Sequence, residues 1–341
     1  MNIRMAIKAF ILPVLMLSFV GAAHANPSWS VLTTQTDATV NSLRGLAVSW
    51  DGSIVYGGYI QTSGNREIRA YDSVSGSLLY STSTGLGAYQ PKGIATDDRG
   101  YVFASATSST FPLGQFRIYN SDLSSLLFSS GNTIASQIGG IATWKSGTSY
   151  YLYIAYEDAA RTISRFNVTN VNAPFLDTTF GTAGSYNVAG AGVLNGINVA
   201  ADGTIYQASR NADQLFRISS DLTSSIFTTV NRAMDSAYFD GRVYVTQYSG
   251  QTSAIAVLDA TTLGFIQTLT TGIPRGTAEG YSGIDIGPDG RIFVADQLFQ
   301  SSGTRSDRIL VSTPIPEPAF FQMGALAAMS GLGLLRLRRK S

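Results

Sequence analysis

The sequence predicts an all-β fold made of six similar units, and three observations support this prediction. First, a short motif recurs along the chain: an apolar run that begins with glycine, an Asp-Gly pair and a second apolar run. Its clearest copy is residues 283–296, GIDIGPDGRIFVAD. Two alternating apolar runs around an Asp-Gly pair are typical of two strands joined by a tight turn that needs a positive φ angle.

Second, the copies are regularly spaced. They begin at Gly45, Gly93, Gly140, Gly196, Ser236 and Gly283, about 48 residues apart on average. A period of about 40–50 residues with several short strands per unit is typical of a propeller blade. Third, no stretch between residues 26 and 313 has the apolar periodicity of a helix. We therefore predict a six-bladed β-propeller that occupies residues 26–313 as one domain.

The individual strands follow from the same pattern. The first repeat supplies four strand candidates, Leu46–Ser49, Ile54–Gly57, Glu67–Tyr71 and Ser77–Ser81. The last repeat supplies only three, Gly283–Ile286, Arg291–Ala295 and Arg308–Ser312. The segment Trp29–Thr34 precedes the first repeat as a lone strand. We expect it to complete the last blade and close the ring, because closure removes exposed sheet edges.

The third strands share a form in which an alternating run ends in Asp, Asn or Ser. Residues 68–72 read IRAYD and residues 116–120 read FRIYN. Such alternation, stopped by a turn residue, is expected of a half-buried strand. On this pattern, residues 29–313 resemble the six-bladed propellers of the NHL-repeat and gluconolactonase-like group.

The N-terminus has the features of an export signal. Arg4 and Lys8 precede an apolar run over residues 9–22, and Ala23-His24-Ala25 has the form of a cleavage site between small residues. A charged start, an apolar centre and such a site predict a secretory signal peptide over residues 1–25.

The C-terminal segment, residues 314–341, has three parts. It begins with the motif Pro316, Glu317, Pro318. Residues 319–335 then carry no charge, which predicts a transmembrane helix about 25 Å long, near the minimum that spans a bilayer. The chain ends in a basic cluster of Arg336, Arg338, Arg339 and Lys340. The positive-inside rule places this cluster in the cytoplasm and the rest of the chain outside it.

This order of parts resembles the PEP-CTERM sorting signal of Gram-negative bacteria. The resemblance implies that a membrane cysteine protease, exosortase, processes the tail during export. It also implies an inner-membrane-anchored precursor, a mature form at the cell surface or in the extracellular matrix, and a link to exopolysaccharide and biofilm production.

Composition and charge exclude several functions. Two of the 23 basic residues lie in residues 1–25 and four in residues 319–341, which leaves 17 against all 22 acids, a net charge of −5. Nucleic-acid binding needs a basic face, so no nucleic-acid partner is expected. The chain has no cysteine, and its single histidine, His24, lies in the predicted signal peptide. Cys/His zinc sites and Ser-His-Asp triads are therefore excluded.

The resemblance to gluconolactonase-like propellers implies a divalent cation in the central channel. Asn195 and Asp235 match two of the ligands in that group. The third ligand, a glutamate in the first blade, is missing, and Arg44 occupies the comparable region, where its charge would repel a cation. We expect no resident cofactor. Calcium at Asn195 and Asp235, in a hydrolase of the gluconolactonase type, is the alternative.

Propeller topology predicts a binding surface at one mouth of the channel. The connections that enter the innermost strands and those between the second and third strands open on the same face. This face would collect Arg44, Lys92, Asn195, Asp235 and Ser282 near the channel. Further out it would carry Tyr59, Tyr156, Glu157, Arg210, Asp213, Tyr248 and Asp296. Loops on a rigid ring often bind partners, and tyrosines among acids and amides can stack on sugars.

The sequence thus predicts an exported, non-catalytic propeller of the envelope or matrix that binds a glycan, such as an exopolysaccharide, or another envelope protein. A calcium-dependent lactonase-like hydrolase and a purely structural matrix component are the alternatives. A sugar-stacking surface would favour the binding protein, and a bound metal with a third carboxylate ligand would favour the enzyme.

Overall fold

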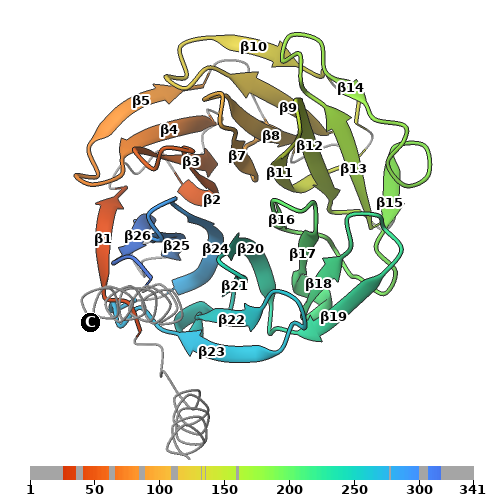
Figure 1. Ribbon diagram of the computed structural model, residues 1–341. Helices are drawn as coiled ribbons and strands as arrows, with labels where there is room; N and C mark the ends of the chain where they lie inside the picture. Colours follow the sequence, from red (N-terminus) through yellow and green to blue (C-terminus); the bar gives the residue numbers. More distant parts are fainter. Residues whose placement is uncertain are drawn as a thin grey trace, which may run out of the picture. The chain divides into compact units, whose positions relative to one another are not determined.

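The computed structural model describes residues 26–35, 41–60, 66–83, 89–108, 114–131, 133–134, 136–158, 161–275, 278–298 and 306–315. These residues form six antiparallel sheets of four or five strands, arranged as blades around a central channel (Figure 1). The prediction of an all-β, six-bladed propeller is confirmed.

Each blade is a meander whose first strand lies nearest the channel and whose last strand lies at the outer edge (Figure 1). Blade 1 consists of β2 (Asn41–Val48), β3 (Ile54–Ile60), β4 (Glu67–Asp72) and β5 (Leu78–Thr82). Blade 2 consists of β6 (Tyr89–Gln90), β7 (Ile94–Thr96), β8 (Val102–Ser108), β9 (Gly114–Tyr119) and β10 (Leu126–Ser129). Blade 3 consists of β11 (Ile138–Ser146), β12 (Ser149–Tyr156), β13 (Thr162–Asn167), β14 (Phe175–Leu176) and β15 (Ser185–Asn187).

The second half of the ring repeats this plan. Blade 4 consists of β16 (Ile197–Val199), β17 (Ile205–Ser209), β18 (Gln214–Ile218) and β19 (Ser225–Thr229). Blade 5 consists of β20 (Ala233–Phe239), β21 (Arg242–Gln247), β22 (Ile255–Asp259) and β23 (Phe265–Leu269). Blade 6 consists of β24 (Ala278–Ile286), β25 (Ile292–Leu298), β26 (Arg308–Ser312) and β1 (Trp29–Thr34).

Strand β1 closes the ring. It pairs antiparallel with β26, with Trp29 opposite Ser312 and Thr34 opposite Arg308, so the N-terminal strand is the outer strand of blade 6. The predicted closure by residues 29–34 is therefore confirmed. Blade 3 contains the longest repeat, and its extra residues divide the outer strand into two short pieces, β14 and β15, which both pair with β13.

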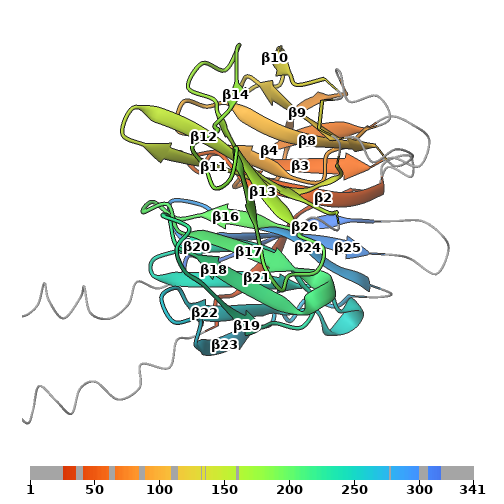
Figure 2. The same cartoon turned by 90° about the vertical axis from the view of Figure 1, so that its right-hand side faces the viewer.

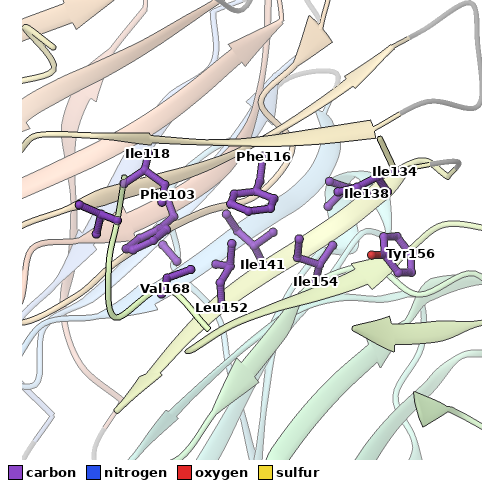
Figure 3. Close-up of a cluster of buried hydrophobic side chains, with 12 residues drawn as sticks. Phe103, Phe116, Ile118, Ile134, Ile138, Ile141, Leu152, Ile154, Tyr156 and Val168 are labelled. Atoms are coloured by element: carbon purple, nitrogen blue, oxygen red, sulfur yellow. The ribbon is translucent and has the colours of Figure 1, made fainter. Parts of the chain in front are cut away.

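The hydrophobic core lies between neighbouring blades rather than inside them. Figure 3 shows one such layer, where Phe103 and Phe116 of blade 2 face Ile141, Leu152 and Ile154 of blade 3. All five side chains are buried. Because alternate residues of a strand point to opposite faces of a blade, each blade supplies side chains to two of these layers.

The strands run between the two faces of the ring, so successive connections open on opposite faces (Figure 2). We call the face on which the innermost strands begin the entry face; it carries Arg44, Lys92 and Asn195. We call the other the exit face; it carries the turns that follow the innermost strands. Two of those turns contain Gly52 and Gly290, with φ angles of 76° and 80°, as the Asp-Gly motif predicts.

Two short 3₁₀ turns, Arg210–Ala212 and Gly250–Thr252, interrupt the connections in blades 4 and 5. Within the residues that the structure describes, no helix is long and apolar enough to cross a membrane. The predicted signal peptide, the sorting motif at residues 316–318, the helix at residues 319–335 and the basic cluster all lie outside the described residues.

Candidate binding sites in the central channel

The recurring glycines mark the points where innermost strands of adjacent blades come closest. A Cβ atom on Gly140 would lie 2.5 Å from the carbonyl oxygen of Asn195, and one on Gly93 would lie 2.9 Å from the nitrogen of Ile141. Neither position has room for a side chain. The repeat of glycine in the sequence is therefore a consequence of crowding around the channel.

Asp235 uses the space that one of these glycines leaves. A Cβ on Gly196 would lie only 1.7 Å from Oδ1 of Asp235, so the carboxylate packs against the bare Cα. Oδ1 accepts a hydrogen bond from the Ser236 N–H (2.9 Å), and Oδ2 accepts one from the Ile284 N–H of blade 6 (3.2 Å). Burial raises the pKa of Asp235 to about 8, although the two N–H donors favour its charged form.

Asp285 has an equivalent role one blade further on. Its Oδ2 accepts the Val48 N–H of blade 1 (2.8 Å), and its Oδ1 accepts the Ile286 N–H (2.8 Å). Burial raises its pKa to about 6. Other innermost strands make similar bridges: the Thr96 hydroxyl donates to the Val48 carbonyl (2.6 Å). Polar side chains on the channel wall thus join the blades to one another.

A single cavity of about 430 Å³ follows the channel from one face to the other. Four of the five residues predicted for the entry mouth line it: Arg44, Lys92, Asp235 and Ser282. The fifth, Asn195, lies just behind. Its amide Nδ2 donates to Oε1 of Glu157 (3.3 Å), and Glu157 forms an ion pair with Lys92. The structure therefore brings the predicted residues together.

These side chains already have partners within the fold. Oδ1 of Asn195 accepts the Arg210 N–H (3.0 Å), and the Ser282 hydroxyl donates to the Leu43 carbonyl (2.7 Å). Within the described ranges, no group of three or more His, Cys, Asp or Glu residues is placed to hold a metal ion. Arg44 lines the same cavity as Asp235, as expected from the resemblance to gluconolactonase-like propellers.

Several residues predicted for the outer rim are inside strands instead. Tyr59 and Tyr156 are 1% and 8% exposed, so neither ring can stack on a ligand. Asp296 is fully buried in β25, where it accepts hydrogen bonds from the guanidinium groups of Arg275 (2.8 Å) and Arg308 (2.9 Å). A sugar-stacking rim that includes these residues is therefore not present on the entry face.

Aromatic side chains gather at the opposite mouth. Trp50, Trp144 and Tyr150 line the exit end of the cavity, beside Asp98 and Lys145. Trp50 is 59% exposed, as much as Phe175 and Phe227 on outer strands, but it lies at the mouth of the cavity. Asp98 and Lys145 form an ion pair (2.6 Å) next to Tyr150, whose ring centroid lies 5.2 Å from the Lys145 ammonium.

Trp144 is held rigidly in this mouth. Its indole N–H donates to the Ala201 carbonyl (3.2 Å), and its ring packs against Gly203, where a Cβ would lie 2.9 Å from Cζ2. The ring of Tyr151 lies 5.6 Å away between centroids. Trp50 has no such hydrogen bond within the described residues. The exit mouth thus combines Trp144, whose ring is held in place, with the more exposed ring of Trp50.

Sequence analysis did not identify this surface. Trp50 and Trp144 are two of only three tryptophans, and they occupy similar places in repeats 1 and 3, just before the turn that ends the innermost strand. That shared position is the signal that could have revealed the aromatic mouth.

Comparisons with known proteins identify the fold alone. No family model and no curated protein matches the chain. A luciferin-regenerating enzyme has a similar structure, with a TM-score of 0.55 and 12% identity over 83% of this chain and 95% of that one. A protein of unknown function from Bacteroides caccae has a TM-score of 0.51 and 12% identity over 72% of this chain and 82% of that one. A nidogen/laminin complex has a TM-score of 0.51 and 15% identity over 67% of this chain and 80% of that one.

Proposed function

We propose that this chain is an exported, non-catalytic β-propeller that binds a glycan at the exit mouth of its channel. The observation that supports the proposal most directly is the cluster of Trp50, Trp144 and Tyr150 around that mouth. Aromatic rings bind the apolar C–H faces of sugars while leaving the hydroxyl groups free for polar partners. The sequence left another envelope protein open as the partner, and this aromatic lining favours the glycan.

The surroundings of the cluster suit such a ligand. Asp98 and Lys145 offer a hydrogen-bond acceptor and a donor at the edge of the rings. The exit mouth opens into the channel cavity, whose whole volume of about 430 Å³ lies within the range of roughly 300–1,000 Å³ that is usual for small-ligand sites. The wall of this cavity is both polar and apolar, and its polar groups can fix the orientation of a ligand.

Screening the full chain against an array of neutral and acidic glycans tests the proposal. We expect binding that Trp50→Ala weakens at least tenfold, because a tryptophan that becomes buried by its ligand contributes much of the binding energy. Phe265→Ala is the matched control, since Phe265 is an equally exposed aromatic (66%) on the outer strand β23. The proposal fails if no glycan binds, or if Trp50→Ala binds as tightly as the unmodified chain.

We also propose that the C-terminal segment sorts the protein to the cell surface through an exosortase-type protease. The support is the order of Pro316-Glu317-Pro318, an uncharged segment and a basic end. The basic residues resist crossing the bilayer, which would hold the C-terminus inside during processing. Glu317→Ala should leave a full-length band in the membrane fraction. Release of that variant at the size of the unmodified protein would show that the motif is misassigned.

A further inference from the structure

Three arginines lie around Tyr248 at the entry mouth, at the opposite end of the channel from the aromatic cluster. Arg44 lies in β2 of blade 1, Arg210 in the turn after β17 of blade 4, and Arg232 just before β20 of blade 5. Their common neighbour is Tyr248, which follows β21. The Cζ atoms of Arg210 and Arg232 lie 5.6 and 5.7 Å from the centroid of the Tyr248 ring.

Arg44 is connected to the same tyrosine through Gln297, and its own Nε donates to the Ser42 hydroxyl (3.1 Å). The Tyr248 hydroxyl lies 3.0 Å from Oε1 of Gln297, and Nε2 of Gln297 donates to the carbonyl of Leu43, the residue before Arg44 (2.5 Å). Burial raises the pKa of Tyr248 to about 12, and the charge of Arg44 opposes that rise. The three arginines and Tyr248 are called the arginine cluster below.

The backbone holds this cluster in place. The Arg210 N–H donates to Oδ1 of Asn195 (3.0 Å), and the Arg232 N–H donates to Oδ1 of Asp213 (2.7 Å). The Tyr248 N–H donates in turn to the Arg232 carbonyl (3.1 Å). Arg232 has a φ angle of 48°, which is uncommon for a residue other than glycine, and Asp213 stabilises this conformation.

The cluster carries an excess of positive charge. In the described part of the chain, none of the three guanidinium groups forms an ion pair. Two carboxylates lie nearby: Glu279 accepts the Tyr248 hydroxyl (2.9 Å), and Asp213 accepts the backbone N–H of Arg232. They offset part of the charge of the three arginines and leave a positive excess. The propeller has a net charge of −5, so these cations are not needed for its solubility. Neighbouring cations also repel one another.

We propose that the arginine cluster is a binding site for an oxyanion, either a carboxylate or a phosphate. Guanidinium groups bind both anions through paired N–H donors, and such charge-assisted hydrogen bonds are about twice as strong as neutral ones. A bound oxyanion would also remove the mutual repulsion of the arginines. The arginine cluster lies at the opposite end of the channel from Trp50, Trp144 and Tyr150, although Arg44 lines the same cavity.

Calorimetric titration of the full chain at low ionic strength tests the site. The probes are sodium galacturonate, which carries a carboxylate on a sugar ring, inorganic phosphate, and galactose as the neutral counterpart of the first. We expect galacturonate or phosphate to bind more tightly than galactose. Binding of galacturonate alone identifies a carboxylate ligand, and binding of phosphate alone identifies a phosphate ligand. If neither anion binds, the proposal is wrong.

Two variants locate the anion. Arg232→Gln should weaken binding about tenfold or more, because it removes one charged hydrogen-bond donor. Arg161→Gln is the matched control: Arg161 is also exposed on the entry face, has a φ angle of 53° and donates its N–H to an aspartate, Asp158. An equal loss of affinity in the control would overturn the assignment. Arg232→Gln should weaken anion binding as much in the Trp50→Ala chain as in the unmodified chain, which separates failure of this site from failure of the glycan site.

Discussion

At the scale of single residues, the channel wall combines crowding with buried charge. The glycine at each repeat start is dictated by the approach of the next blade, and this is why the motif is visible in the sequence. Asp235 shows what the repeat motif does not predict. Its position on the channel was predicted, but its hydrogen bonds to Ser236 and Ile284 depend on the distance between blades, which no local pattern encodes.

The buried acids predict an unusual dependence of stability on pH. The folded-state pKa values of Asp235 and Asp285, about 8 and 6, lie above the ordinary value near 4. Between about pH 4 and its folded-state pKa, each of these carboxyl groups is protonated in the folded state and ionised in the unfolded state. The free energy of unfolding should therefore fall as pH rises from about 4 to 8, by at most about 1.4 kcal/mol per pH unit for each proton.

Urea unfolding at pH 5 and pH 8 measures this effect. The background is low because the only histidine, His24, lies outside the propeller. Asp235→Asn cannot titrate, so it should lose less stability than the unmodified chain between the two pH values. Asp240→Asn, a change at an exposed turn, should behave like the unmodified chain. A pH dependence that is identical in the unmodified chain and Asp235→Asn would contradict the account.

At the scale of strands, the sequence predicted their number and order better than their ends. In blade 1 the second strand was expected to end at Gly57, but β3 continues to Ile60 and takes Tyr59 into the core. In blade 6 the second strand was expected to end at Ala295, but β25 includes Asp296. Strand ends were missed because pairing with a neighbouring strand extends them beyond the alternating run.

The closing strand gives a prediction at this scale. Leu32 of β1 packs against the core between blades 6 and 1, whereas its neighbour Val31 is 40% exposed. Leu32→Ala should lower the free energy of unfolding by about 1–2 kcal/mol, because it leaves a gap at the closure of the ring. Val31→Ala should change it by less than about 0.5 kcal/mol. Thermal unfolding of the two variants would contradict closure by β1 if their melting temperatures were equal.

At the scale of the whole molecule, the ring has two mouths of different chemistry. The entry mouth is polar and carries the arginine cluster, and the exit mouth carries Trp50, Trp144 and Tyr150. The sequence predicted Arg44, Lys92, Asn195, Asp235 and Ser282 near the entry mouth from the starts of the innermost strands. It placed Arg210 and Tyr248 further out on the same face, and it did not predict Arg232. The aromatic mouth was missed because its residues come from blades 1 and 3, and only the closed ring brings them to one cavity.

Binding of a glycan at the exit mouth, as we propose, would change the environment of Trp50, and tryptophan fluorescence reports that change. The full chain is titrated with the array glycan that binds most tightly. The emission should change with saturation, because Trp50 moves from solvent into contact with a sugar. Trp50→Phe, which keeps an aromatic ring, should still bind but lose most of the change. If saturating glycan leaves the emission of the unmodified chain unaltered, the ligand does not bind at this mouth and the account is wrong.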